Sequence, residues 1–205
     1  MKPRAKDWNK IYLEGKHFTP VENKLVGRLL KFAKKRIGEK IKNVLDLGCG
    51  TGDFAVKLAK KGLRVVCVDF SPIALKIARE NAQKGGVGRG IKFVKHDLEK
   101  LEKLKSPEKF DLAVHRLTFA FIKNKKRFLS SIRTLLKPGG IFALMTPVLL
   151  PRAAYSKHLK TISVKKAEVE QLLKGEFKKY VIFHRRPFGE RGLEITYIVQ
   201  NKKRA

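Results

Sequence analysis

The chain has 205 residues, 43% of them hydrophobic, with 48 Lys and Arg against 18 Asp and Glu. This length and composition predict a single globular domain over residues 1–205, with an N-terminal segment at 1–40 and a core at 41–200. No apolar run approaches the roughly 20 residues that a membrane helix needs, and no apolar segment follows the first basic residues as it would in a secretory signal. We therefore expect no membrane partner.

The net charge of +30 is the unusual bulk feature, and basic residues are in excess along the whole chain rather than in a tail. Such a surface favours polyanions such as RNA, DNA or an acidic protein. A lysine-rich composition with solvated charges over an ordinary core explains the charge equally well. The sequence leaves the oligomeric state open between monomer and dimer.

The two cysteines, Cys49 and Cys67, lie in a glycine-rich turn and in an apolar run, without the spacing of metal ligands. This pattern predicts reduced thiols in a cytoplasmic protein and no metal site.

A helix start is predicted near residue 20. Thr19 has the character of an N-cap, Pro20 suits the first helical position, and Glu22 completes a capping box. Apolar residues then recur at helical spacing as far as Ala33. The aromatic residues Trp8 and Tyr12 precede this helix.

The next stretch combines a strand, a glycine turn and a helix. Residues 44–47 read as a short buried strand that contains Asp46, and Gly48, Gly50 and Gly52 form a G-x-G-x-G turn before helical spacing resumes. Such a unit opens a nucleotide-binding α/β fold, in which a cofactor approaches the backbone closely. Asp53 departs from the dinucleotide pattern, because an acid at this helix start would repel a pyrophosphate.

Acidic residues follow the next two predicted strands. Residues 64–68 end at Asp69, and residues 91–95 are followed by His96 and Asp97. A carboxylate at the end of the second strand can accept hydrogen bonds from both hydroxyls of a ribose. Between these strands, Ser71 and Pro72 begin a predicted helix over residues 71–82.

The rest of the chain continues the alternation of strands and helices. We expect strands at 110–115, 141–145, 177–183 and 193–199, helices at 128–136 and 163–174, and a basic loop between the last two strands. The fold class predicted is α/β, a doubly wound, seven-stranded and mostly parallel sheet. Its last strand is expected to run antiparallel beside the fifth, because no long helix separates the closing pair.

The stretch Val44–Gly52, the acids that follow it and the run Leu-Leu-Lys-Pro-Gly-Gly at residues 135–140 together resemble the class I S-adenosylmethionine-dependent methyltransferases, with their Rossmann-like fold. The resemblance implies S-adenosyl-L-methionine as cofactor. It implies that Asp69 holds the ribose, that Phe70 lies against the adenine, and that Asp97 and the Leu98 backbone bond to it. The cofactor-binding residues implied are Tyr12, Asp46, Gly48, Cys49, Gly50, Gly52, Asp69, Phe70, Asp97, Leu98 and His115.

Two assignments stay open at this stage. Trp8 and Tyr12 either fold over the cofactor, as in many small members of the family, or pack the helix at 20–33 onto the sheet. His115 ends the fourth strand at the family's methyl-transfer position, and it is either a general base or a structural residue. The sequence lacks the Asn- or Asp-Pro-Pro-aromatic motif and the cysteine nucleophile that two nucleic-acid subclasses of the family carry there.

Three functions fit the sequence: a methyltransferase for a small or unassigned acceptor, one for RNA or an RNA-associated protein, and a cofactor- or RNA-binding module without activity. The run Lys123–Arg127 places cations at a helix start, where they oppose the helix dipole. An anionic acceptor such as a phosphate would offset both the positive end of the helix dipole and the charges of the basic side chains, so this run favours an anionic partner.

Overall fold

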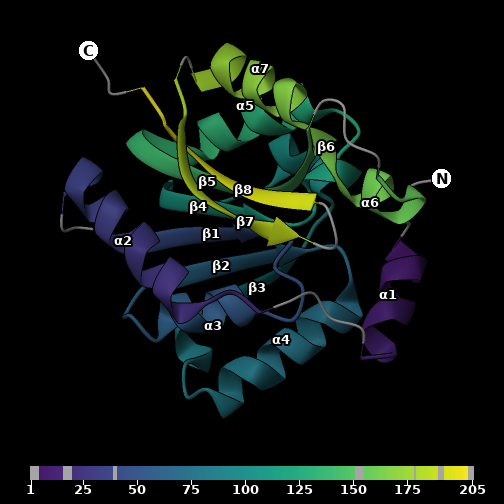
Figure 1. Cartoon of the computed structure of the whole chain (residues 1–205). Coiled ribbons are helices and arrows are strands. Elements are labelled where there is room, and N and C mark those ends of the chain that lie inside the picture. Colours follow the sequence, from purple (N-terminus) through teal and green to yellow (C-terminus); the bar gives the residue numbers. More distant parts are fainter. Residues whose placement is uncertain are drawn as a thin grey trace.

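The computed structural model describes residues 5–15, 20–38, 41–150, 155–177, 179–188 and 192–202. Its centre is one sheet with the strand order β3-β2-β1-β4-β5-β8-β7, and the short β6 pairs with β5 outside this path (Figure 1). The strands are β1 Asn43–Leu47, β2 Arg64–Asp69, β3 Ile91–Lys95, β4 Phe110–Arg116, β5 Leu136–Leu149, β6 Val164–Lys165, β7 Val181–Phe188 and β8 Gly192–Gln200.

The predicted fold class is confirmed. Strands β1 to β5 are parallel, and β8 runs antiparallel between β5 and β7. The short β6 is an addition that the sequence pattern did not predict. Among the described residues, no helix has both the length and the apolar character needed to cross a bilayer.

Helices cover both faces of the sheet, with α2, α3 and α4 on one side and α5 and α7 on the other (Figure 1). All residues of β1 are buried, as expected for a central parallel strand that is covered on both faces. The helices are α1 Ala5–Leu13, α2 Asn23–Ile37, α3 Asp53–Ala59, α4 Pro72–Lys84, α5 Lys125–Leu135, α6 Lys157–Ile162 and α7 Lys166–Phe177, with short 3-10 turns η1 Gly88–Gly90, η2 Leu98–Lys103 and η3 Phe119–Phe121.

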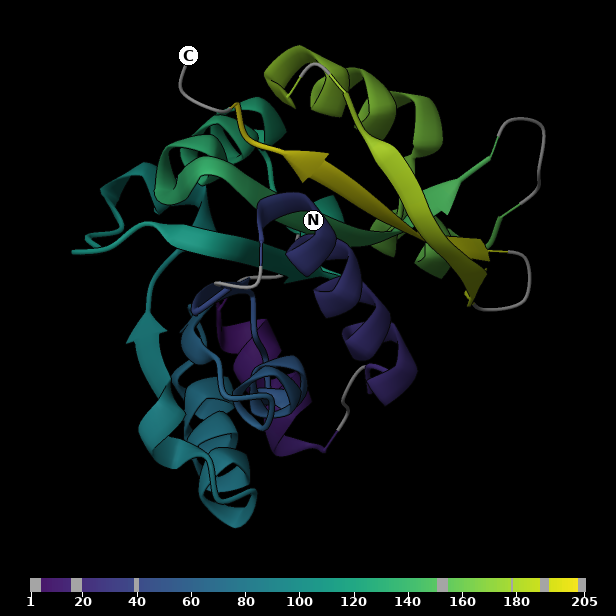
Figure 2. The same cartoon turned by 90° about the vertical axis from the view of Figure 1, so that its left-hand side faces the viewer.

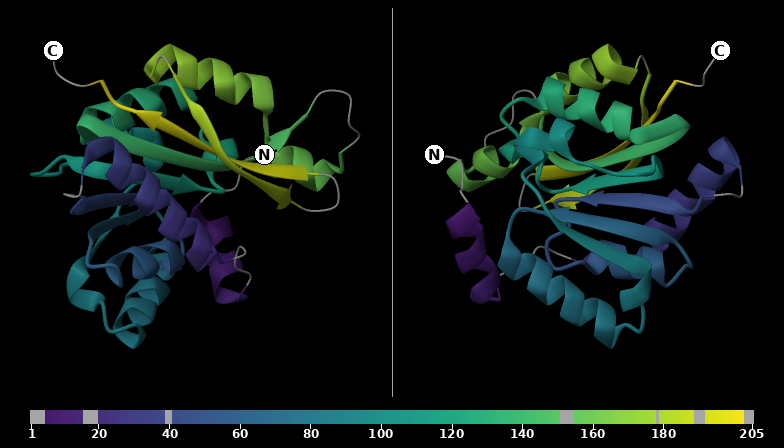
Figure 3. Two further views of the ribbon diagram at one scale, coloured as in Figure 1. Left: turned by 60° about the vertical axis from the view of Figure 1, so that its left-hand side comes forward. Right: turned by 180° about the vertical axis from the view of Figure 1, so that it is seen from behind.

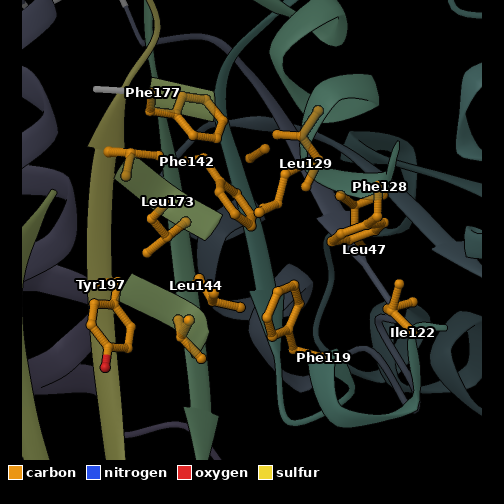
Figure 4. Packing of buried hydrophobic residues seen from close by; sticks show 14 of the residues in the cluster. Leu47, Phe119, Ile122, Phe128, Leu129, Phe142, Leu144, Leu173, Phe177 and Tyr197 are labelled. Atoms are coloured by element: carbon orange, nitrogen blue, oxygen red, sulfur yellow. The ribbon is translucent and has the colours of Figure 1, made fainter. Parts of the chain in front are cut away.

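The core beneath α5 and α7 is rich in aromatic residues. Phe128 of α5, Phe177 of α7 and Phe142 of β5 point into one apolar cluster, joined by Tyr197 from β8 (Figure 4). Full burial of each such side chain stabilises the fold by about 1.5–3 kcal/mol. This packing fixes the ends of β4 and β5 against their helices.

The first long helix begins later than predicted. Helix α2 starts at Asn23, not at Pro20, and Thr19 lies outside the described residues. The Val21 N–H donates to Asp53 Oδ2 at 2.7 Å, which holds this segment extended against the start of α3. The local capping signals are therefore overridden by a tertiary hydrogen bond.

The C-terminal elements also differ in their bounds. The predicted helix at 163–174 corresponds to α7, which starts at Lys166 after the short β6 rather than at Ser163. The preceding α6, capped by Ser156, was not predicted. Strand β7 begins at Val181 and includes His184–Arg186, which were expected in a loop. The two glycines of the Leu-Leu-Lys-Pro-Gly-Gly run at residues 135–140 lie within β5, where the pairing with β4 is irregular.

Strands β5 and β8 reach past the end of β4. Arg116, the last residue of β4, pairs with Met145, whereas β5 continues through Leu149 and pairs with β8 as far as Val148. Four extra residues extend a strand by about 13 Å. The β7–β8 hairpin forms the rest of this overhang, which projects at one end of the sheet in Figure 2.

Candidate active site

A pocket of about 270 Å³ opens at the carboxyl ends of β1 and β4. In a doubly wound sheet this is the edge where ligands bind. Among the predicted site residues, Tyr12, Asp46, Gly48, Cys49 and Gly50 line it. Its other lining residues are Pro20, Thr51, Asp53, Phe54, Asn81, Arg116, Leu117 and Thr118.

The glycine turn has the tight geometry that its sequence predicts. Gly52, which precedes α3, has a φ of 79°, and a Cβ there would lie 2.9 Å from the Cβ of Ala78. Gly50 has a φ of 53°, and its Cβ would lie 3.0 Å from the Tyr12 hydroxyl oxygen. Side chains are excluded at both positions by conformation and space. The backbone of the turn therefore faces the pocket directly at Gly50.

Asp46 places a buried acceptor in the pocket. The residue is only 3% exposed, and its Oδ2 has no hydrogen-bond partner in the described part of the chain. Burial raises the pKa of its carboxyl to about 7, helped by the nearby Asp69 and opposed by Arg116. A buried carboxylate oxygen without a partner is costly, so a cation such as an ammonium group fits this position.

Asp69 shapes the glycine turn from behind. Its Oδ2 accepts a hydrogen bond from the Gly50 N–H at 2.9 Å, and its Oδ1 accepts one from the Ser71 N–H at the same distance. Burial raises the pKa of this carboxyl, and the two backbone donors oppose that shift. Asp69 does not line the pocket, so its contact with a ribose remains a prediction.

Helix α1 covers one side of the site. Trp8 packs edge-on against Phe121, with ring centroids 5.2 Å apart, in a cluster that includes Phe70 and Ala74. Figure 3 shows α1 beside α4, separate from α2. Trp8 and Tyr12 therefore do not pack α2 onto the sheet, and Tyr12 reaches the pocket from α1. Burial raises the pKa of the Tyr12 hydroxyl, which stays protonated.

Asp97 and Leu98 do not line the pocket. The Asp97 side chain is exposed, and its Oδ1 accepts from the Glu99 N–H at 3.0 Å as the cap of η2. Leu98 packs against the core beneath α5. Their contacts with an adenine, like that of Phe70, remain predictions.

His115 lies on the wrong face of the sheet for a general base. Its side chain is fully buried, its Nδ1 is 2.9 Å from the Leu47 carbonyl oxygen, and its ring is 4.8 Å from that of Phe128. Burial lowers the pKa of this imidazole to about 4. The ring lies in the core and does not line the pocket, which favours the structural alternative for His115 over a general base or a cofactor contact.

The next residue takes the place that was expected of His115. Adjacent residues of a strand point to opposite faces, so Arg116 faces the pocket. Leu117 then adopts a φ of 62°, the one positive φ outside glycine in the described ranges. This conformation costs about 1–3 kcal/mol and is typical of functional sites. It turns the chain from β4 towards Thr118, which also lines the pocket.

Acidic side chains of this chain contact the basic run Lys123–Arg127. Glu99 accepts hydrogen bonds from two backbone N–H groups at the start of the run. Lys125 pairs with Glu168 at 3.7 Å, and Arg127 lies 4.0 Å from Glu102. Internal acids therefore offset part of the charge at this helix start, which removes the local argument for an external phosphate, and an anionic partner stays a prediction.

Known proteins share this fold. Residues 39–201 match the family model described as "Methyltransferase domain". A malonyl-[acyl-carrier protein] O-methyltransferase of Ilyobacter polytropus is 33% identical over 108 residues, which are 53% of this chain and 40% of that protein. An S-adenosyl-L-methionine-dependent Diels-Alderase of Talaromyces variabilis is 35% identical over 138 residues, 67% of this chain and 44% of that protein.

Among solved structures, TehB from Haemophilus influenzae superposes with a TM-score of 0.65 at 17% identity, covering 95% of this chain and 67% of that one. The chain spans less than half the length of several curated relatives that it matches. Because the family model matches most of the chain, the protein belongs to the methyltransferase-domain family, whose members use S-adenosylmethionine as methyl donor.

Proposed function

We propose that this chain binds S-adenosylmethionine in the pocket beside the glycine turn and transfers its methyl group to an acceptor held at the ends of β4 and β5. The observation that carries the proposal is the unpartnered, buried Oδ2 of Asp46 in that pocket. It matches the ammonium group of the cofactor's methionine portion, and the bare backbone at Gly50 lets a ligand approach closely.

The bound cofactor supplies a methyl group activated by a sulfonium, and such a displacement needs chiefly correct placement of the acceptor. The residues of this chain accordingly bind and orient. Asp69 holds the Gly50 N–H and so fixes the turn, while Tyr12 closes the pocket from α1. His115 takes no part in proton transfer, because it is buried in the core.

The relatives do not identify the acceptor. One is named for a malonyl-[acyl-carrier protein], and another is named for a cycloaddition rather than a methyl transfer. The chain's acceptor must therefore be argued from its own residues. We also propose a cytoplasmic location, since both cysteines are free and a reducing compartment keeps them so.

Two measurements test the proposal in sequence. Calorimetry with S-adenosylhomocysteine should show one site per chain. The Asp46→Ala substitution should lower the affinity for S-adenosylmethionine much more than it lowers the affinity for an S-adenosylhomocysteine analogue that lacks the amino group. Labelled methyl transfer is then followed into metabolite, protein and RNA fractions of a cell extract. A folded protein that binds neither compound would refute the cofactor site. Binding without transfer to any fraction would favour a cofactor-binding module instead.

A further inference from the structure

A second group of charges lies beside the pocket, on the overhang of β5, β7 and β8. Pro147 of β5 pairs with Glu194 of β8, which pairs with Arg186 of β7, so these residues share one face of the sheet. Arg116 lies on the same face, because its partner Met145 is two residues from Pro147. The overhang thus continues the pocket wall away from β1.

Glu194 is buried, at 1% exposure, and it is matched by Arg186. The Arg186 Nε and Nη2 donate to its two carboxylate oxygens at 3.0 and 2.8 Å. Arg116 Nη2 lies 4.0 Å from the same carboxylate, which is a charge contact without a hydrogen bond. Two guanidinium groups therefore share one carboxylate.

Arg116 keeps unused hydrogen-bond donors. Its side chain is 15% exposed, and its Nε and Nη2 have no hydrogen-bond partner in the described segments. The other carboxylates that influence it are Asp53, which pairs with Lys57, and Asp46, whose Oδ2 makes no bond. Buried donors are costly when left unpaired, so an arginine in this state is suited to a ligand.

Arg116 lines the same pocket as Asp46 and the glycine turn, and its ion pair lies on the side of that pocket towards β8. The glycine turn follows β1 and Asp69 ends β2, whereas the ion pair draws Arg116 towards β8, on the far side of β5. The guanidinium is held there by charge rather than by fixed hydrogen bonds, and it can present its planar fork to the pocket.

We propose that Arg116 is a specificity-determining residue that binds a carboxylate of the methyl acceptor, with Glu194 and Arg186 holding it in place. The inference rests on the proposed function. A monoanion fits best, because a single positive charge remains once Glu194 is counted and Asp46 is paired with the ammonium group of the cofactor, as the proposed function has it. The carboxylate serves to orient the acceptor, since pairing with a guanidinium lowers its own nucleophilicity, and another atom receives the methyl group.

The test uses the whole chain saturated with S-adenosylhomocysteine, and the melting temperature is followed with acetate, acetamide or inorganic phosphate at matched ionic strength. Acetate should raise the melting temperature of the parent more than acetamide does. Arg116→Gln should abolish this difference, and Arg116→Lys should reduce it. The matched control is Arg185→Gln, because Arg185 is exposed and lies on the opposite face of β7.

The outcomes separate the inference from the proposed function. Failure of the parent to bind S-adenosylhomocysteine concerns the cofactor site alone. A tenfold loss of S-adenosylhomocysteine affinity in Arg116→Gln would overturn the inference, because Arg116 would then serve the cofactor's own carboxylate. An acetate effect that is absent in the parent, retained in Arg116→Gln or exceeded by phosphate would also overturn it. Since Glu194 keeps Arg186, the variant is expected to fold.

Discussion

Replacement of Asp69 by asparagine tests whether the glycine turn is held from behind. Each carboxylate oxygen now accepts one backbone N–H, from Gly50 and from Ser71. Asparagine has one acceptor oxygen, so one of these buried donors would face its NH₂ group unpaired. The loss is about 1–3 kcal/mol, partly offset because the buried charge also disappears. We expect a net destabilisation of about 2 kcal/mol.

For a chain of this size, that value corresponds to a fall in melting temperature of about 4–8 °C. Urea unfolding at pH 7 measures it directly. The matched control is Asp97→Asn, because Asp97 is an exposed cap and asparagine caps as well as aspartate. An Asp69→Asn chain as stable as this control would refute the reasoning. A weaker affinity for S-adenosylhomocysteine should accompany the loss of stability, since the turn is no longer fixed.

Three further predictions concern single residues. Because the pKa of Asp46 is raised to about 7, a bound ammonium group should lower it, and binding of S-adenosylmethionine at pH 6 should release a proton. Calorimetry in two buffers of different ionisation enthalpy measures this release, which Asp46→Asn should remove; an unchanged release in that variant would exclude Asp46 as its source. Gly52→Ala should destabilise the fold by about 2 kcal/mol or more through its positive φ and its contact with Ala78, whereas Gly175→Ala, in a helix with open space, should stabilise it by about 0.5–1 kcal/mol. Equal unfolding midpoints for these two variants would contradict the strain argument. His115, with its pKa lowered from 6.5 to about 4, contributes stability that is fully present above pH 6.5 and is lost as the pH falls towards 4. The parent should therefore lose more stability between pH 7 and pH 5 than His115→Gln does, and parallel losses would show that the ring is not buried in solution.

The order of the strands and the glycine turn could be predicted because their signals are local and successive. Buried strands alternate with helices, and the residues after β1 and β2 follow a pattern that a nucleotide site requires. The antiparallel β8 could be predicted from the absence of a long helix between the closing strands. Such signals do not depend on distant contacts.

The choice between His115 and Arg116 could not be made from the sequence. Strand β4 is buried on both faces up to its last residue, so there is no alternation of polar and apolar residues to show which side faces the pocket. The register with β1 decides it, because His115 pairs with Leu47, one residue away from Asp46. Two other features also depend on partners distant in sequence. The start of α2 depends on the hydrogen bond from the Val21 N–H to Asp53, and the helix start at Lys123 receives its negative charge from Glu99.

The distribution of acids has a consequence for how the molecule behaves in solution. Four of the acidic residues, Asp46, Asp69, Asp111 and Glu194, are buried, whereas no Lys or Arg is buried within the described ranges. The outer layer therefore has a larger positive excess than the sequence as a whole, and its charges repel one another. Added salt should raise the stability of this chain by screening that repulsion. RNA that binds at low salt is then held by the counter-ion effect expected of any strongly basic surface. Only RNA binding that persists at physiological ionic strength indicates a specific acceptor.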